Sequence, residues 1–172
     1  MSIRHAKARG EWAELRFMER ATELGLRVTK PWGDNAPYDF AVDSRGHFLR
    51  VQVKCTRQKR WNSYRCHLDS NGHPYSPAQI DFIAAYIIPE DAWYILPIRA
   101  TNHQPEILLN PTRANSRHAQ FKEAWHLLVL SADAAACPEH SRKGPPGVEC
   151  RQPQSGERTQ PTAQAVGQGP IG

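Results

Sequence analysis

Two neighbouring segments that alternate polar and apolar residues constrain the fold more than any other feature of the chain. The alternation runs through residues 38–43 and again through residues 47–55, and the residues between them, 43–46, read Asp-Ser-Arg-Gly. Alternation with a period of two is typical of a β-strand, and Asp-Ser-x-Gly is typical of a tight turn. The sequence therefore predicts a β-hairpin over residues 38–55.

The same alternation gathers polar side chains on one face of this hairpin. Asp39 lies on the first strand and Gln52 and Lys54 lie on the second, so the three side chains can share a face. Polar groups flanked by hydrophobic residues are costly unless they act together. The strands alone leave two interpretations open, which are a functional cluster and a solvent-facing side of the hairpin.

A helix is predicted over residues 10–25, where Gly25 gives the C-terminal signal. At about 100° per residue, Glu14 falls in the middle of a mostly apolar arc that includes Leu15 and Phe17. An ionised carboxylate there costs several kcal/mol unless it is paired, hydrogen-bonded or bound to a cation. Glu14 is therefore a partner of an arginine, a side chain that reaches solvent, or a cation ligand.

The remaining pattern predicts more strands and a second helix. The apolar residues of segment 121–128 recur at i, i+3, i+4 and i+7, which indicates an amphipathic helix entered through Asn115 and Ser116. An order of helix, strands and helix predicts an α/β fold with a mixed central sheet flanked by helices. The additional strands are expected at residues 27–29, 63–68, 82–88 and 93–98.

Composition changes near residue 132. The segment after this point holds six of the fourteen prolines and no Phe, Tyr or Trp, so it cannot bury enough apolar surface to offset the entropy of ordering it. We expect one domain over residues 1–131 and a disordered Pro/Gly/Gln-rich tail over residues 132–172. The longest apolar run, residues 82–88, is far shorter than the ~20 residues of a membrane helix, and no secretory signal is visible. The chain is predicted to be cytoplasmic, with no membrane partner.

Positive charge is concentrated beside the hairpin. The chain has 22 Lys and Arg against 17 Asp and Glu, a net charge of +5. Between Ser44 and His67 there are seven basic residues and no acidic one, with Trp61 and Tyr64 interleaved. This segment is either a grip for a phosphate backbone or a solvated, arginine-rich loop. Its basic residues are Arg45, Arg50, Lys54, Arg57, Lys59, Arg60 and Arg65.

The polar residues singled out above lie in motifs with a known counterpart. Gly-Glu-Trp-Ala-Glu at residues 10–14, Pro-Tyr-Asp at 37–39 and Val-Gln-Val-Lys at 51–54 resemble the PD-(D/E)XK nuclease superfamily. Commoner members of that superfamily have Glu or Asp where Gln52 stands. The similarity covers roughly residues 6–128.

A narrower resemblance is to the group I intron-associated homing endonucleases of that superfamily, which share the Gln-x-Lys variant. It is carried by Tyr-Asp-Phe-Ala-Val-Asp at residues 38–43 and Val-Gln-Val-Lys-Cys-Thr at 51–56. Pro-Trp-Gly-Asp at 31–34 and the segment 80–86 also fit this subgroup.

The resemblance implies a restriction-endonuclease-like core and a Mg²⁺-dependent endonuclease that cuts double-stranded DNA. The catalytic residues carried over are Glu14, Asp39, Gln52 and Lys54. The metal would be held by Asp39, by Glu14 and by the backbone carbonyl of Val53, because Mg²⁺ prefers oxygen ligands. One site per chain and two strands to cut favour a homodimer or a higher homo-oligomer.

Next to such a site, the basic segment is expected to bind DNA through Arg50, Arg57, Lys59, Arg60 and Trp61. Turn or strand-end roles are expected for three further acids, Asp34, Asp43 and Asp81.

Two alternatives stay open at this point. The first is a DNA-binding module of the same fold in which Gln52 marks lost catalysis. The second is a scaffold protein whose tail recruits a partner and whose Glu14 is a structural ion pair. Metal-dependent cutting distinguishes the nuclease from both.

Overall fold

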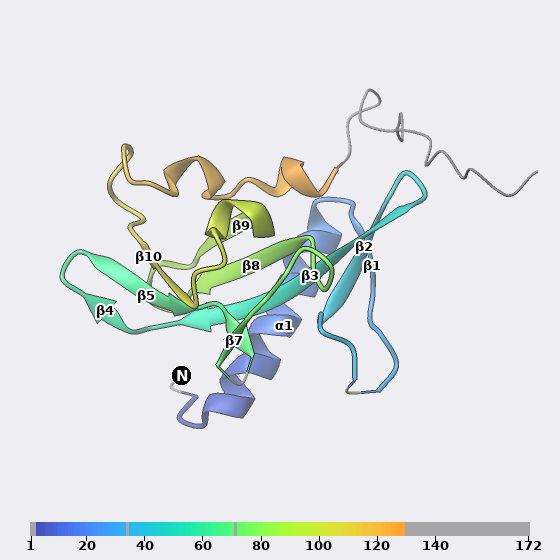
Figure 1. The fold of residues 1–172 in the computed structure, drawn as a ribbon, viewed down its shortest axis with the longest axis horizontal. Helices are drawn as coiled ribbons and strands as arrows, with labels where there is room; N and C mark the ends of the chain where they lie inside the picture. The colour runs from blue at the N-terminus through green and yellow to red at the C-terminus, as the bar shows by residue number, and fades with distance from the viewer. Residues whose placement is uncertain (1–2, 34, 71, 130–172) are drawn as a thin grey trace, which may run out of the picture. The chain divides into compact units, whose positions relative to one another are not determined.

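The segments with a period of two become strands of one mixed sheet. In the computed structural model, which describes residues 3–33, 35–70 and 72–129, the strand order is β1-β2-β3-β8-β9 (Figure 1). β3 and β8 are parallel, and the other neighbouring strands are antiparallel. The prediction of an α/β fold with a mixed central sheet is confirmed. The strands are β1 (Arg27–Thr29), β2 (Phe40–Ser44), β3 (His47–Thr56), β8 (Phe82–Ile87) and β9 (Ala92–Pro97).

The predicted hairpin is β2 and β3, and its register fixes the later site. Phe40 lies opposite Val51. The backbone N–H of Asp39 donates to the carbonyl of Val51 at 3.0 Å, which extends the pairing one residue before β2. Asp39 therefore lies beside Gln52, on the face that the alternation predicted.

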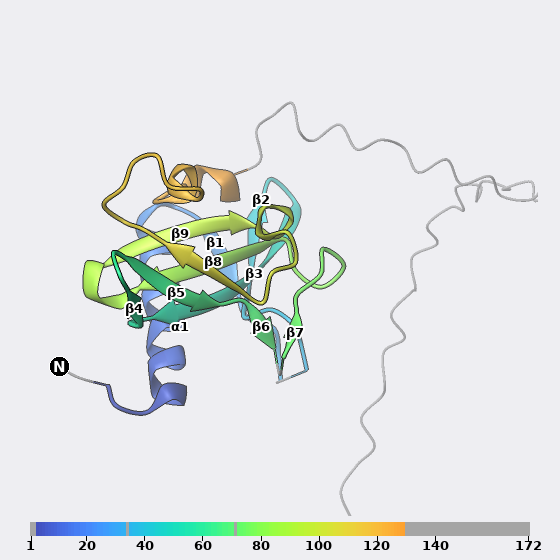
Figure 2. The same cartoon turned by 60° about the vertical axis from the view of Figure 1, so that its left-hand side comes forward.

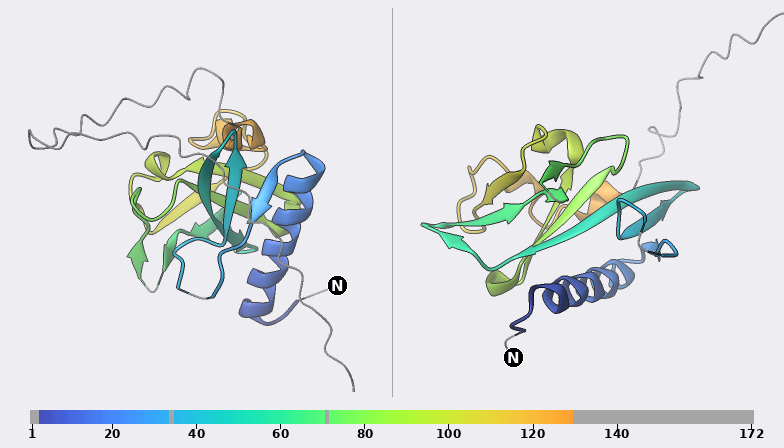
Figure 3. Two further views of the ribbon diagram at one scale, coloured as in Figure 1. Left: turned by 90° about the vertical axis from the view of Figure 1, so that its right-hand side faces the viewer. Right: turned by 60° about the horizontal axis from the view of Figure 1, so that its bottom comes forward.

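The helix α1 (Ala6–Glu23) packs on one face of this sheet (Figure 3). It begins four residues before the predicted start, and its buried residues are Ala13, Phe17 and Ala21. This i, i+4, i+8 stripe is narrower than the predicted apolar arc. Leu15, expected on the buried side, lies two residues from Ala13 and is 59% exposed. Glu14 consequently lies at the edge of the buried stripe and not in its middle.

The other face of the main sheet is covered by a second, small sheet that the sequence pattern did not predict in full. Its strand order is β10-β5-β4, and β5 (Ser63–His67) corresponds to the strand expected at residues 63–68. In the left view of Figure 3, α1 lies on one side of the main strands and β4 and β5 lie on the other. The strands missed from the sequence are β4 (Lys59–Arg60), β10 (Glu106–Leu109), β6 (Asp69–Ser70) and β7 (His73–Pro74).

The amphipathic helix predicted over residues 121–128 is wrong. The segment instead contains two short 3₁₀ helices, Ala119–Phe121 and Trp125–Leu128. Between them Lys122 forms a bridge with Tyr94 of β9. Tertiary pairing with the edge strand β9 therefore overrides the local helical periodicity.

The break between these two 3₁₀ helices is stabilised by hydrogen bonds between Glu123 and Trp93. The N–H of Glu123 donates to the carbonyl of Trp93 at 2.8 Å, and the N–H of Trp93 donates to Glu123 Oε1 at 2.7 Å. Glu123 has a φ of +50°, which a continuous helix does not allow. The apolar residues still face the core, where the Trp125 ring lies 5.6 Å from that of Phe17. Two more 3₁₀ helices, Ile88–Glu90 and Ile98–Thr101, follow β8 and β9.

Within the described residues, no helix has the length and apolar content needed to cross a membrane. The tail predicted over residues 132–172 lies outside the described residues, so the domain boundary stays a prediction.

Candidate active site

Asp39 stands at the entrance to β2, where its carboxylate faces the side chain and backbone of β3. Asp39 Oδ2 accepts hydrogen bonds from Val53 N at 2.7 Å and from Gln52 Nε2 at 2.5 Å. The same Gln52 amide nitrogen lies 3.3 Å from the carbonyl oxygen of Val53. The amide group of Gln52 therefore bridges two oxygens that the family resemblance assigns to a cation.

The surroundings of Asp39 disfavour the ionised form of its carboxyl group. Burial raises the pKa of this carboxyl group above its usual value, and the negative charge of Glu14 raises it further. The hydrogen bonds from Val53 and Gln52 and the positive charge of Lys54 oppose this rise without cancelling it. A cation beside Asp39 would therefore stabilise its ionised form.

Lys54 is held by a hairpin that follows it in the chain. Its Nζ donates to the backbone carbonyl of Asp69, in β6, at 2.9 Å and lies 5.0 Å from the ring centroid of Tyr75. Tyr75 is buried. An ammonium fixed by a carbonyl and an aromatic face has little freedom to move. Neither Tyr75 nor the carbonyl of Asp69 could be predicted from the sequence, because Asp69 lies in the short β6–β7 hairpin and Tyr75 directly follows it, and this hairpin has no alternation of its own.

Glu14 meets a lysine that sequence analysis missed. Lys30 Nζ lies 2.8 Å from Glu14 Oε2 and 5.6 Å from the ring centroid of Phe40. The hydrogen bond to Glu14 raises the pKa of Lys30, and the charges of Asp39 and Glu11 act in the same direction. The ion-pair interpretation of Glu14 thus holds in this structure, with a lysine in place of the expected arginine.

The basic segment contains side chains with an ion pair and side chains without one. Arg57, Lys59 and Arg60 are exposed, and the structure gives none of them an ion pair or a side-chain hydrogen bond among the described residues. The Arg60 guanidinium lies 4.9 Å from the ring centroid of Trp61, whose side chain is 78% exposed. The β4–β5 hairpin, whose strands are labelled in Figure 2, therefore presents positive charge and an aromatic ring to solvent.

Arg50, which was predicted to bind DNA, is engaged elsewhere. Its guanidinium forms an ion pair with Asp81 at 2.9 Å and donates to the carbonyls of Pro77 and Ala78. Burial alone would raise the pKa of Asp81, but the hydrogen bonds from Arg50 lower it below its usual value. Asp81 takes the strand-end role that was expected for it. Arg65 is paired as well, with Glu106 at 3.1 Å.

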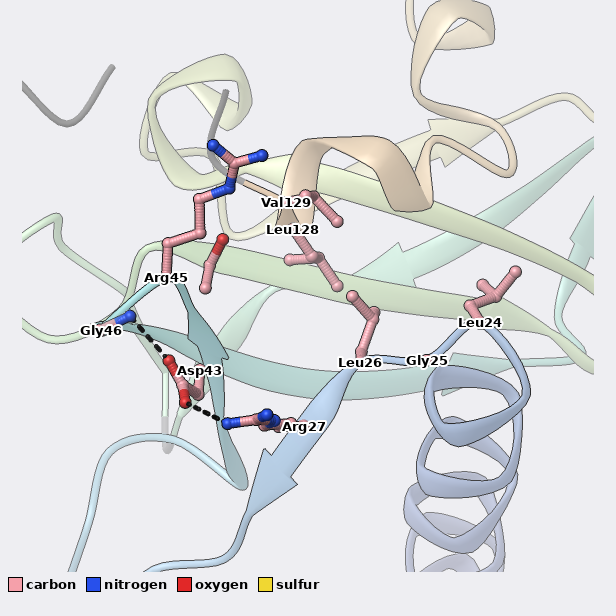
Figure 4. Close-up of a pocket in the computed structure, with 10 residues that line it drawn as sticks. Leu24, Gly25, Leu26, Arg27, Asp43, Arg45, Gly46, Leu128 and Val129 are labelled. Carbon is pink, nitrogen blue, oxygen red and sulfur yellow. Dashed lines mark hydrogen bonds and ion pairs between the residues drawn. The ribbon is translucent and has the colours of Figure 1, made fainter. Parts of the chain in front are cut away.

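Asp43 also takes its expected turn role, in a pocket away from the site (Figure 4). Its Oδ1 accepts from the N–H of Gly46 at 3.0 Å, and its Oδ2 lies 3.9 Å from Arg27. Gly46 has a φ of +84°, which a glycine adopts without strain. The third spare acid, Asp34, lies outside the described residues.

The donors around Asp39 fit a hard cation. The candidate ligands are the carboxylates of Asp39 and Glu14 and the carbonyl of Val53, all of them oxygens. Gln52 would add its amide oxygen only after its amide turns, because its nitrogen faces Asp39 Oδ2 and Val53 O. Oxygen donors are the preference of Mg²⁺, which keeps several of its own waters. Within the described residues no group of three His, Cys, Asp or Glu is arranged to hold a metal. Any cation here would therefore rest on two carboxylates supplemented by neutral oxygens.

Comparison with known proteins agrees with this geometry. A model of the PD-(D/E)XK endonuclease family matches residues 4–128, which include every residue discussed in this subsection. The chain belongs to the PD-(D/E)XK endonuclease family. The membership inferred from the Glu, Asp and Gln-x-Lys motifs is thereby confirmed, and the chain stands among nucleases.

The fold of the chain is also similar to that of a solved structure. The bacterial homing endonuclease I-Ssp6803I is similar with a TM-score of 0.63 and 28% identity, over 74% of this chain and 93% of that chain. The restriction-endonuclease-like core and the homing-endonuclease resemblance are both supported by this match. No curated protein sequence matches the chain significantly.

Proposed function

We propose that this PD-(D/E)XK protein is a divalent-metal-dependent endonuclease that hydrolyses phosphodiester bonds in double-stranded DNA, with Mg²⁺ as its cofactor. The observation that carries the proposal is the meeting of Asp39, Gln52 and Lys54 on one face of β2 and β3. Glu14 enters from α1, close enough for its charge to act on Asp39. A site that keeps two carboxylates close at a cost to its own stability is typical of function.

The cation would be held by Asp39, Glu14 and the carbonyl of Val53. When bound, Mg²⁺ lowers the pKa of a coordinated water and neutralises charge that develops on the phosphate. Gln52 contributes a neutral oxygen, so it orients without adding negative charge. For its oxygen to face the cation, its amide must turn, because the nitrogen now points to Asp39 Oδ2 and to Val53 O.

Lys54 would orient the attacking water and offset negative charge on the phosphate. Its Nζ is already fixed by the carbonyl of Asp69 and the ring of Tyr75. Preorganised groups of this kind stabilise a transition state without the cost of moving into place during the reaction.

The β4–β5 hairpin and the residues just before it would bind DNA. Arg57, Lys59 and Arg60 offer free positive charge, and Trp61 offers an exposed ring for sugar or base contact. Arg50 would reach a phosphate only by giving up its ion pair with Asp81. We therefore give Arg50 a supporting role at the start of β8, next to Asp81, although the sequence predicts that it contacts DNA.

We also propose that the chain acts as a homo-oligomer, in the manner of an intron-associated homing endonuclease. One proposed site per chain cuts one strand at a time, so a symmetric pair of sites would serve a double-strand cut. The measured molar mass of the purified protein, free and on a duplex, tests this.

A second candidate function is supported by one observation. Gln52 replaces an acidic residue, and its amide nitrogen lies between the two oxygens of the proposed cation site. A protein with a weak hold on its cation would bind DNA and cut it slowly or not at all. This alternative is a DNA-binding module of the same fold.

One experiment separates the two functions. The purified full-length protein is incubated with genomic DNA and with plasmid DNA, with and without Mg²⁺, and the products are resolved on a gel. The nuclease predicts cutting that needs Mg²⁺ and is absent in Lys54→Ala. Duplex binding without cutting at any Mg²⁺ concentration would favour the binding module.

A further inference from the structure

The loop between β1 and β2 brings Lys30 against the proposed cation ligands. Its ammonium group lies 2.8 Å from the carboxylate of Glu14 and 5.6 Å from the ring centroid of Phe40. Phe40 directly follows Asp39 in the chain. Lys30 thus has two contacts. One is with Glu14, a proposed cation ligand, and the other is with Phe40, the neighbour of the proposed ligand Asp39.

The charge of Lys30 acts on more than one carboxylate. Besides its ion pair with Glu14, it interacts favourably with Asp39 and with Glu11. An ammonium in this place balances the negative charge that a divalent cation would otherwise balance. The other carboxylate, Asp39, accepts a hydrogen bond at 2.5 Å from the neutral amide of Gln52, which stabilises its ionised form without neutralising its charge.

An ammonium and a divalent cation cannot share such a place without cost. Coulomb's law in water gives about a tenfold effect on binding for a single and a double positive charge roughly 6 Å apart. The cost falls if the ammonium leaves, and Lys30 is free to do so because its side chain is 59% exposed.

We propose that Lys30 is a resident counter-ion of the Glu14–Asp39 site, which the divalent cation must displace when it binds. Lys30 is thus a positioning residue that sets the affinity for the cation and holds Glu14 in place in its absence. This inference rests on the proposed function, since it assumes that Glu14 and Asp39 hold a cation.

The test is the affinity for Mn²⁺ alone, without DNA, measured by the electron paramagnetic resonance signal of the free ion. Mn²⁺ takes the same oxygen ligands as Mg²⁺. Lys30→Met should bind Mn²⁺ more tightly than the wild-type chain, by up to about tenfold, because no ammonium then has to be displaced. Lys30→Arg keeps the charge and should bind like the wild type. Lys7→Met is the matched control for net charge, because Lys7 is exposed on the first turn of α1 and should leave the affinity unchanged.

The possible outcomes are distinct. A Lys30→Met protein that binds Mn²⁺ no more tightly than the wild type overturns the counter-ion role and leaves the proposed nuclease intact. Wild-type protein that binds no Mn²⁺ overturns the cation site itself, and this inference with it. A gain in Lys30→Met that is also seen in Lys7→Met would reflect net charge alone and would equally overturn the role of Lys30. The circular dichroism spectrum of each variant verifies that it is folded.

Discussion

Asp39 and Asp43 lie four residues apart at the two ends of one strand, and their surroundings differ completely. Asp43 caps the β2–β3 turn through Gly46 and faces Arg27, an arginine whose side chain is 85% exposed (Figure 4). Asp39 is partly buried beside another carboxylate, and its pKa is raised. Asp43 stabilises the fold, whereas Asp39 stands where the fold would be more stable without its charge.

The contrast indicates how a candidate functional acid is recognised in this protein. Both aspartates occur in the same alternating segment, so residue type and periodicity treat them alike. They differ in the charges around them: Asp43 lies beside Arg27, whereas Asp39 has the like charge of Glu14 near it as well as the charge of Lys54. These surroundings depend on contacts between distant parts of the chain. Structural aspartates gain a donor or a cation, as Asp43 and Asp81 do. Asp39 accepts hydrogen bonds but also lies near Glu14, which carries the same charge. A carboxylate whose ionised form is disfavoured in this way is a candidate for catalysis.

The largest expected effect is on cutting. Asp39→Asn should lower the rate of DNA cleavage by roughly a thousandfold, because loss of a metal ligand removes several kcal/mol of transition-state stabilisation. Asp43→Asn is the matched control at the other end of β2 and should cleave like the wild type. Initial rates on a plasmid substrate at saturating Mg²⁺ give the comparison, and equal rates for the two variants would remove the distinction between the two aspartates.

The next effect compares free and paired basic residues. If Arg57, Lys59 and Arg60 each contact a phosphate, log affinity should fall with log salt with a slope of roughly −2.7, so a fourfold rise in salt weakens binding by about 40-fold. This is smaller than the slope of about −4.5 that five contacts would give, because Arg50 and Arg65 are paired in the structure.

Fluorescence anisotropy across a salt series measures this slope. Alanine at Arg57, Lys59 and Arg60 together should bring the slope close to zero, on target and random duplexes alike. Arg45→Gln, at the turn beside Asp43, should leave it unchanged. If Arg45→Gln flattens the slope as much as the triple variant does, our proposal places the DNA at the wrong end of the sheet.

A smaller effect is expected at Tyr75. Tyr75→Leu removes the aromatic face beside Lys54 and should slow cutting about two- to fivefold, the range of a cation–π contact of ~0.5–1 kcal/mol. Tyr75→Phe keeps the ring and should cut normally. The rate at saturating DNA and Mg²⁺ is the measurement, and a Tyr75→Leu enzyme as fast as Tyr75→Phe would leave Lys54 positioned by the Asp69 carbonyl alone.

The smallest expected effect is on the stability of the metal-free protein. Because the pKa of Asp39 is higher in the folded than in the unfolded chain, the folded state binds the proton more tightly. This contribution favours folding at low pH and is lost as pH rises through the folded-state pKa. Asp39→Asn should therefore raise the free energy of unfolding at neutral pH, whereas Asp43→Asn should lower it or leave it unchanged. Urea unfolding in the presence of a chelator measures both.

The parts of the fold predicted from sequence are those fixed by local pattern. The β2–β3 hairpin follows from alternation around a glycine turn, and the shared face of Asp39, Gln52 and Lys54 follows from the hairpin. Family resemblance then joined Glu14 to them. The missed parts depend on contacts between distant segments. The helix expected near Trp125 is broken by pairing of Lys122 and Glu123 with β9.

The missed site residues have the same origin. Lys30 reaches Glu14 from an irregular loop, and Tyr75 reaches Lys54 from a short hairpin. Neither residue lies in a periodic segment, so no pattern along the chain indicates its partner. The pairing of Arg50 with Asp81 joins residues 31 positions apart and was equally out of reach.

Thermal unfolding of the full chain with and without Mg²⁺ measures whether Asp39 and Glu14 hold a divalent cation. A ligand at about 100 times its dissociation constant adds about 2.7 kcal/mol to stability, or roughly 5–10 °C in melting temperature for a domain of this size. We predict this gain for the wild type and for Asp43→Asn, a smaller gain for Glu14→Gln, and none for Asp39→Asn. A wild-type melting temperature that does not change at millimolar Mg²⁺, or a gain in Asp39→Asn as large as that of the wild type, would contradict the account.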